Sequence, residues 1–177
     1  MSKRSLLLDA QAIQRALARM AHEIMERNPS ISKLVIVGIQ RGGVYLAHRL
    51  SGLLQKIGGH PVPVGALDVS MHRDDLDNRV THHIHPTAIP FDITGKTVVL
   101  VDDVLFSGRT TRAAMDALND FGRPRSIQLA VLVDRGHREL PIKADFVGKN
   151  VPTSLQERVN VVLHEEGGDD TVHLEKI

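Results

Sequence analysis

The chain contains no cysteine and no tryptophan, and it has a single tyrosine. Without cysteine it forms neither a disulfide framework nor a thiolate metal site, which is compatible with a reducing cytoplasm. Few aromatic rings are available to stack on single-stranded nucleic acid. No apolar run approaches the roughly 20 residues of a membrane span, and the first residues lead into no signal-peptide core. We therefore expect a cytoplasmic protein without a membrane partner.

An excess of charge of one sign is also missing. The 22 Lys and Arg residues nearly balance the 21 Asp and Glu residues, so the formal net charge is +1. Net charge thus gives no reason to bind nucleic acid, and any such site must be a local patch. The length of 177 residues is typical of one domain with a sizeable core. We expect a single domain over residues 1–177.

Helix and strand patterns alternate along the chain, which favours an α/β fold with a mainly parallel sheet. Asp9 can cap a helix that reaches Asn28. Further helices are expected at 44–56 and at 110–121, where Gly122 ends the helix. Buried strands are expected at 34–37, 62–69, 98–101 and 127–133. Three short strands, at 145–147, 159–163 and 172–174, should pack over one end, and residues 70–90 should form an exposed hairpin or mobile loop.

The segment 98–111 carries most of the functional information. Its apolar strand ends in Asp102-Asp103, and a short loop with Ser107 and Gly108 leads into a helix from about Arg109. A loop between a strand and a helix N-terminus directs backbone N–H groups and positive dipole potential at one point, which suits a phosphate. The two carboxylates would repel a bare phosphate, but they suit ribose hydroxyls or hydrated Mg²⁺. The pattern therefore favours a sugar phosphate.

This segment resembles the phosphoribosyl-pyrophosphate (PRPP) signature of type I phosphoribosyltransferases. Two other interpretations need weighing, a Walker B strand and a plain core strand with a solvated end. A Walker B strand requires a Walker A loop, and Gly95-Lys96-Thr97 is the sole Gly-Lys-Thr of the chain. Pro90 occupies the position of the first glycine of a Walker A loop. A strand, and not a helix, follows Gly95-Lys96-Thr97, so the Walker A motif is not present there.

A second glycine-rich loop, residues 38–43, also follows an expected strand and precedes a helix. Ligands of open α/β sheets bind at such positions, and Arg41 with the backbone amides could hold a pyrophosphate. In the expected mobile loop, Arg73-Asp74-Asp75 is either a solvated turn or a closing segment whose Arg73 neutralises the departing pyrophosphate. His82, His83 and His85 could bind zinc, although a polar loop tip explains them better because no acid or thiol completes the set.

Three further stretches, residues 17–28, 122–141 and 144–154, resemble the PyrR family of pyrimidine operon attenuator proteins, which are also uracil phosphoribosyltransferases. The resemblance spans nearly the whole chain. It implies a type I phosphoribosyltransferase fold, in which helices flank a mainly parallel twisted sheet, with a small C-terminal hood at about 135–177 and a mobile loop at about 70–90. Two departures stand out. Relatives commonly read Gly-Ile-Lys-Thr-Arg-Gly where this chain has Arg41 followed by Gly42, and they often carry Tyr in place of Phe106.

The reaction implied by this resemblance is uracil plus PRPP giving UMP and pyrophosphate, with Mg²⁺ held through PRPP and not by direct protein ligands. Asp102, Asp103 and Arg73 would be catalytic. The base hood would include Arg135 and Val159, which could equally be structural, and no general base stands out. The residues that would bind PRPP or nucleotide are Gln40, Arg41, Gly42, Gly43, Val104, Leu105, Phe106, Ser107, Gly108, Arg109 and Thr110.

Position 106 bears on the choice of base. Purine phosphoribosyltransferases carry an acid there that assists proton transfer, and Phe106 cannot do this. The sequence therefore favours a pyrimidine, with a purine salvage enzyme as an alternative.

The resemblance also implies a structured mRNA leader as a partner, with UMP as effector, and a homodimer or homotetramer. The cations at matching positions are Arg19, His22, Arg27, Arg138, Lys143 and Lys149. Arg19 and His22 share a helix face opposite the apolar one, which is otherwise an ordinary solvated surface. The alternative is a salvage phosphoribosyltransferase with no RNA-regulatory role.

Overall fold

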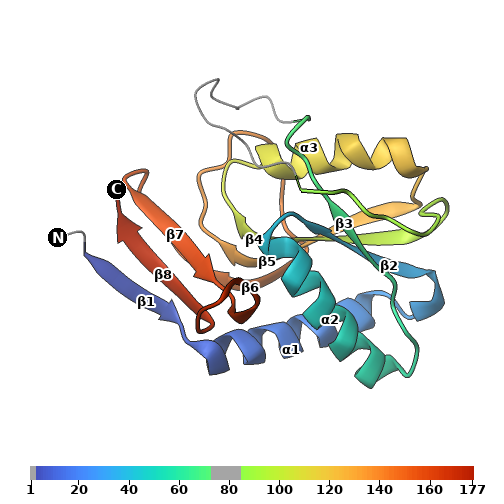
Figure 1. Ribbon diagram of the computed structural model, residues 1–177, viewed down its shortest axis with the longest axis horizontal. Helices are drawn as coiled ribbons and strands as arrows, with labels where there is room; N and C mark the ends of the chain where they lie inside the picture. The colour runs from blue at the N-terminus through green and yellow to red at the C-terminus, as the bar shows by residue number, and fades with distance from the viewer. Residues whose placement is uncertain (1–2, 73–84) are drawn as a thin grey trace.

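The computed structural model describes residues 3–72 and 85–177 and contains two separate sheets (Figure 1). The larger sheet has five strands in the order β3-β2-β4-β5-β6, and all neighbouring strands are parallel. The expected α/β fold with a mainly parallel sheet is confirmed. The strands are β2 (Leu34–Ile39), β3 (Val64–Leu67), β4 (Thr97–Leu105), β5 (Ser126–Asp134) and β6 (Phe146–Asn150).

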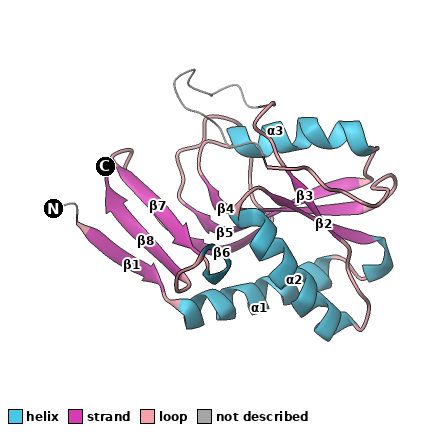
Figure 2. Ribbon diagram, in the orientation of Figure 1, coloured by secondary structure: helices cyan, strands magenta, loops and turns pink. Residues whose placement is uncertain are grey.

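Helices cover both faces of this sheet (Figure 2). On one face lie α1 (Ala10–Arg27) and α2 (Gly42–Gly58), whose apolar residues share a core with one side of the strands. On the other face α3 (Arg109–Leu118) packs its alanines against the opposite side. The expected cap is confirmed, because the Asp9 side chain accepts a hydrogen bond of 2.8 Å from the Ala12 N–H.

The strand order creates a switch point between β2 and β4. After β2 the chain forms α2 on one face of the sheet and returns as β3, which pairs with the edge of β2 that faces away from β4. After β4 it forms α3 on the other face and returns as β5, which pairs with the edge of β4 that faces away from β2. The loops that leave β2 and β4 therefore diverge, and open α/β sheets bind their ligands in the crevice between such loops.

The smaller sheet is antiparallel and has the order β1-β8-β7. It joins β1 (Arg4–Leu8) to β7 (Glu157–Val162) and β8 (Thr171–Lys176) and carries both ends of the chain (Figure 1). The sequence did not indicate β1. The prediction that all three tail strands pack over one end was wrong for β6, which extends the main sheet. Only β7 and β8 lie apart from that sheet, where β1 joins them.

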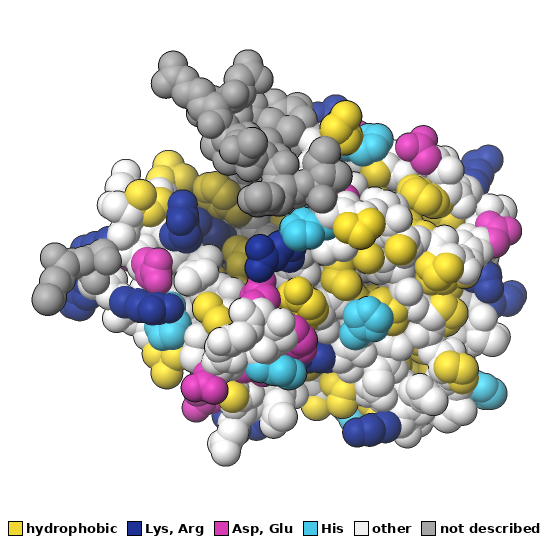
Figure 3. Space-filling model, in the orientation of Figure 1, with side chains coloured by type: hydrophobic (Ala, Val, Ile, Leu, Met, Phe, Trp, Pro, Cys, Tyr) yellow, Lys and Arg dark blue, Asp and Glu magenta, His cyan; other side chains and the backbone are white. Residues whose placement is uncertain are grey.

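Several boundaries also differ from the prediction. The helix expected at 110–121 ends at Leu118, and a short 3-10 turn, Asn119–Phe121, leads to Gly122. Residues 85–90 return beside β3, where Ala88 forms an antiparallel bridge with Ala66. Among the described residues, no helix is both long and apolar enough to cross a membrane. On the face shown in Figure 3, basic and acidic side chains are interspersed, in keeping with the small net charge.

Candidate active site

The acidic pair lies inside β4 and not at its end. The strand continues to Leu105, so that Asp102 is in register with Val131 and Leu105 with Asp134 of β5. Asp102 is buried, with 8% of its surface exposed, and Asp103 is partly buried. Both carboxylates accept hydrogen bonds of 2.8 Å from the next residue's N–H. The sheet thus fixes the backbone that carries both acids.

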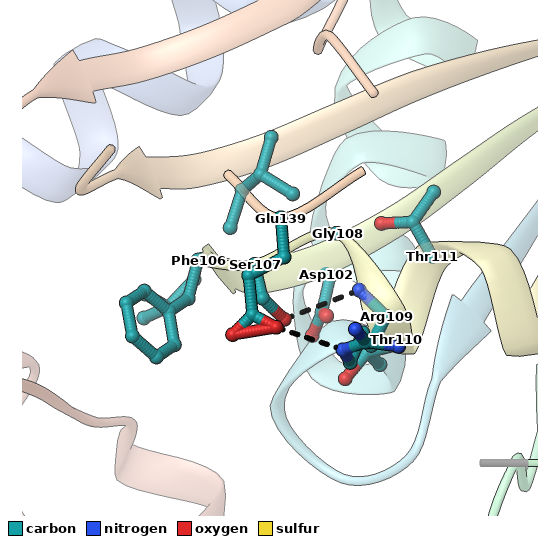
Figure 4. Close-up of a pocket in the computed structure, with 10 residues that line it drawn as sticks. Asp102, Phe106, Ser107, Gly108, Arg109, Thr110, Thr111 and Glu139 are labelled. Atoms are coloured by element: carbon teal, nitrogen blue, oxygen red, sulfur yellow. Dashed lines mark hydrogen bonds and ion pairs between the residues drawn. The ribbon is translucent and has the colours of Figure 1, made fainter. Parts of the chain in front are cut away.

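The loop after β4 forms a small cradle at the N-terminus of α3. Gly108 stands just before the helix with φ of 93°, a left-handed conformation that favours glycine. The Ser107 hydroxyl accepts a hydrogen bond from the Arg109 N–H at 3.3 Å. A cavity of about 160 Å³ lies here, and Figure 4 shows how its residues surround it. Its lining consists of Asp102, residues 104–111 and Glu139.

Glu139 is a member of this cradle that the sequence did not indicate. Its carboxylate accepts a hydrogen bond of 2.9 Å from Arg109 Nε (Figure 4). Its own N–H donates to the Ser107 carbonyl at 2.9 Å. A carboxylate therefore holds an arginine at the mouth of a site suited to an anion. The contact joins segments 30 residues apart, so no local pattern reveals it.

The glycine-rich loop after β2 meets the acidic pair directly. A Cβ atom on Gly42 would lie 2.7 Å from Asp103 Oδ2, and one on Gly43 would lie 2.3 Å from the Val101 carbonyl oxygen. Glycines therefore allow the two loops to approach each other. Between them lies a second cavity, of about 470 Å³. Its lining consists of Gln40, Arg41, Gly42, Asp68, Ser70, His85, Asp102, Asp103, Val104, Thr110, Val161 and Glu166.

Asp68 is another lining residue that the sequence analysis missed. Its carboxylate accepts hydrogen bonds from the Ser70 N–H and hydroxyl and from the His85 N–H, at 2.6–2.9 Å. Burial raises the pKa of Asp68, but these hydrogen bonds outweigh it and hold the pKa below its usual value. Asp68 is therefore ionised at neutral pH and ties together the two ends of the segment between Ser70 and His85.

Arg73 and the histidines at 82 and 83 lie outside the described residues, so their predicted roles stay predictions. His85, the third histidine of that cluster, is described and lines the larger cavity. The Gln40 side chain donates to the Pro86 carbonyl at 3.3 Å. Arg41 forms an ion pair of 2.9 Å with Glu166, another residue that the sequence did not single out.

The two hood candidates occupy different environments. The Arg135 guanidinium lies 4.1 Å from the centre of the Phe106 ring, a cation–π distance, and donates to the Thr153 hydroxyl and the Ser154 carbonyl. Burial lowers the pKa of Arg135, yet an arginine stays charged at neutral pH. Val159 belongs to the core shared with α1 and α2. Val161, two residues along β7, lines the larger cavity instead.

Three of the six cations expected to bind RNA lie on α1 and the neighbouring strand β6, and the role of all six stays a prediction. Arg19 and Arg27 lie on α1 next to β6, where Arg19 donates to the Gly148 carbonyl and Arg27 pairs with Asp145 at 2.6 Å. Lys149 on β6 donates to the Leu7 carbonyl. His22 and Lys143 are exposed.

Arg138, another of these six cations, contacts the loop that follows β4. Its guanidinium donates to the Phe106 carbonyl at 2.8 Å and to the Ile142 carbonyl at 2.9 Å, and it pairs with Asp134. It therefore supports the loop that follows β4.

The fold and both loops define a class of protein, and comparisons with known proteins agree. The phosphoribosyl transferase domain family matches residues 4–165. Among solved structures, a hypoxanthine phosphoribosyl transferase from Trypanosoma cruzi superposes with a TM-score of 0.75 at 18% identity, covering 97% of this chain and 91% of that one. A hypoxanthine phosphoribosyltransferase from Staphylococcus aureus gives a TM-score of 0.66 at 22% identity, with coverages of 85% and 80%. At these identities the likeness shows the fold alone.

Relatives with higher sequence identity identify a particular family within this class. The Bifunctional protein PyrR of Roseiflexus sp. (strain RS-1) is 59% identical over 170 residues, which cover 95% of this chain and 93% of the relative. The Bifunctional protein PyrR of Bacillus subtilis (strain 168) is 53% identical over 175 residues, 97% of each chain. The chain therefore belongs to the phosphoribosyltransferases and, among them, to the PyrR family.

Proposed function

We propose that the protein is a uracil phosphoribosyltransferase, which converts uracil and PRPP to UMP and pyrophosphate. One observation carries this proposal. Two loops of the phosphate-binding type leave the neighbouring strands β2 and β4 and meet at Asp103, so that two adjacent cavities share Asp102, Val104 and Thr110. A ligand with a phosphate at each end and a diol between them matches this arrangement.

Each part of PRPP has a place in the arrangement. The 5′-phosphate would occupy the cradle of residues 107–111, where backbone N–H groups and the dipole of α3 favour an anion. The ribose hydroxyls would donate to the carboxylates of Asp102 and Asp103. The pyrophosphate would lie beside residues 40–43, with Arg41 as a charged donor.

The chemistry is a displacement at the anomeric carbon. A bond forms between this carbon and the uracil nitrogen, the bond to the pyrophosphate oxygen breaks, and the uracil proton leaves. Such displacements pass through an oxocarbenium-like state. The two carboxylates beside the ribose would stabilise that positive charge, and the loops would hold the reacting atoms in line.

Magnesium suits this site. The larger cavity presents the carboxylate oxygens of Asp102 and Asp103, and oxygen is the ligand atom that Mg²⁺ prefers. When bound, Mg²⁺ would neutralise pyrophosphate charge, its coordination completed by phosphate oxygens and water. Asp102 and Asp103 would hold this complex through its hydration shell or the ribose.

The base would lie beside Phe106, on the side of the hood. Phe106 offers no acid to a purine ring, and the Arg135 guanidinium lies 4.1 Å from the centre of the Phe106 ring. A pyrimidine is therefore the preferred base. The test is the initial rate of UMP formation from uracil and PRPP with and without Mg²⁺. Formation of UMP that requires Mg²⁺ supports the proposal, and a chain that makes no UMP would contradict it.

The second proposed activity is binding of a pyrimidine-operon leader RNA, tightened by UMP, to attenuate transcription. The support is membership of a family whose relatives are named bifunctional, and the exposed cations Arg19, Arg27 and Lys149 beside α1 and β6. A cytoplasmic homodimer or homotetramer suits this role. A salvage enzyme without an RNA partner is the alternative. A gel-shift titration of leader RNA against an unrelated hairpin, with and without UMP, distinguishes the two.

A further inference from the structure

Each candidate phosphate loop contains an arginine that holds a glutamate from the C-terminal part of the chain. Arg109, after β4, pairs with Glu139 at 2.9 Å. Arg41, after β2, pairs with Glu166 at 2.9 Å. Both pairs lie at cavity walls, so in this structure a carboxylate contacts each arginine that a phosphate would need.

Glu166 is held in place by its own surroundings. It ends the short 3-10 turn His164–Glu166, between β7 and β8, and its N–H donates to the Leu163 carbonyl at 2.9 Å. The same turn is tied to α2, because Arg49 pairs with Glu165 at 2.8 Å and with Asp170 at 2.7 Å. The Glu166 side chain is 21% exposed, whereas that of Arg41 is 56% exposed. The turn thus holds the backbone that carries Glu166, and the side chain of Arg41 is the more exposed partner of the pair.

We infer that Glu166 is a specificity-determining residue: it competes with the pyrophosphate of the substrate for Arg41 and so sets the affinity for diphosphate ligands relative to UMP. This inference rests on the proposed function. A pyrophosphate that enters the larger cavity meets both the arginine and the negative charge of Glu166. To bind, the pyrophosphate must displace Arg41 from Glu166, and the negative charge of Glu166 repels it.

UMP should not be affected in this way. It has no pyrophosphate, and its 5′-phosphate belongs in the smaller cavity, whose lining includes neither Arg41 nor Glu166. Glu139 differs in this respect, because it lies in the smaller cavity and would oppose the 5′-phosphate of both PRPP and UMP. Of these two ion pairs, only Arg41–Glu166 therefore distinguishes a ligand that carries pyrophosphate from UMP.

The test is calorimetric titration of the full chain with magnesium pyrophosphate and, separately, with UMP. We expect Glu166→Gln to tighten pyrophosphate binding by about three- to tenfold, as the loss of an exposed ion pair and of one nearby like charge allows. UMP affinity should stay within about twofold, since its phosphate site is separate. The KM for PRPP should fall along with the pyrophosphate dissociation constant.

Glu165→Gln is the matched control, because it removes the same charge from the same turn but contacts Arg49 and not Arg41. It should leave pyrophosphate affinity within about twofold of wild type. A double-mutant cycle provides the second check: in an Arg41→Gln background, Glu166→Gln should lose most of its effect. Thermal unfolding of each variant, with Glu166→Ala as a substitute if Glu166→Gln does not fold, verifies that folded proteins are compared.

The outcomes separate this inference from the function on which it rests. A wild-type chain that forms UMP, together with a Glu166→Gln variant of unchanged pyrophosphate affinity, would overturn the inference alone. An equal gain in affinity for UMP and pyrophosphate would also overturn the inference alone, and so would a gain in pyrophosphate affinity that persists in the Arg41→Gln background. A wild-type chain that binds neither ligand would overturn the proposed function and this inference with it.

Discussion

The backbone of Gly42 lies against the carboxylate of Asp103, so closely that a Cβ atom at position 42 would stand 2.7 Å from Oδ2. This contact joins the loop after β2 to the acidic pair of β4. The proposed pyrophosphate and ribose sites are therefore neighbours, and a change in one displaces the other.

Gly42→Ala tests this relationship. The added methyl group must push the Asp103 carboxylate aside, because real Cβ contacts this short do not occur. We expect kcat/KM for PRPP to fall about tenfold, which corresponds to about 1.4 kcal/mol of transition-state stabilisation. Steady-state kinetics measure this. The control is Gly52→Ala on α2, where a Cβ atom meets nothing within 4 Å, and its activity should match wild type.

Much of this site was predictable because its signals are local. The apolar run of β4, the acids and the glycine before α3 all fall within one short segment. The strand and the helix N-terminus were confirmed, although the strand continues past the acids to Leu105. The short strands were harder. β1 has an exposed pattern over most of its length and is held by pairing with β8, near the opposite end of the chain. Such pairing leaves no trace in a local pattern.

Glu139 and Glu166 were missed for the same reason. Each is an ordinary charged residue in sequence and acquires a role only through contact with an arginine far along the chain, 30 residues away for Arg109 and 125 for Arg41. β6 was misplaced because its last two residues, Lys149 and Asn150, are polar and exposed, as on the edge of a sheet. Its position in the main sheet depends on its pairing with β5.

The choice of base can be tested by competition. Hypoxanthine, guanine and adenine should react much more slowly than uracil, because Phe106 supplies no acid for a purine ring. The measurement is product formation from equal concentrations of the four bases. A purine rate equal to or above the uracil rate would contradict the pyrimidine assignment.

RNA binding can be separated from catalysis through Lys149. This exposed residue of β6 donates a hydrogen bond of 3.3 Å to the Leu7 carbonyl and lies outside both cavity linings. If it contacts a phosphate, Lys149→Glu should lower leader-RNA affinity by about tenfold or more and weaken its salt dependence. UMP formation should be unchanged. Lys176→Glu on β8 is the control, and equal losses in both variants would contradict a local patch.

Arg138→Glu should behave differently from Lys149→Glu. Because Arg138 supports the Phe106 carbonyl and pairs with Asp134, reversing its charge should reduce UMP formation as well as any RNA binding. A gel-shift titration and an activity assay on the same preparation give both values. Full catalytic activity in this variant would show that the loop after β4 does not depend on Arg138.

The Arg49–Asp170 pair predicts a pH effect on stability. The hydrogen-bonded Arg49 guanidinium lowers the pKa of Asp170 to about 2. A carboxyl group whose pKa is lowered on folding stabilises the fold above its unfolded pKa, and this stabilisation is lost as pH falls through the folded pKa. The pair should contribute about 2 kcal/mol at pH 7. The melting temperature of Asp170→Asn should therefore lie below that of wild type at neutral pH. The difference between the two melting temperatures should become smaller below about pH 4.

The most direct test of the central claim is the initial rate of UMP formation by the double variant Asp102→Asn/Asp103→Asn, with uracil, PRPP and Mg²⁺. Each lost charge-assisted hydrogen bond to the ribose is worth about 1.5–3 kcal/mol, so the rate should fall by at least about 100-fold. Thermal unfolding should show a folded protein, because the amides keep the shape of the acids. A folded double variant with the wild-type rate would contradict the assignment of this site.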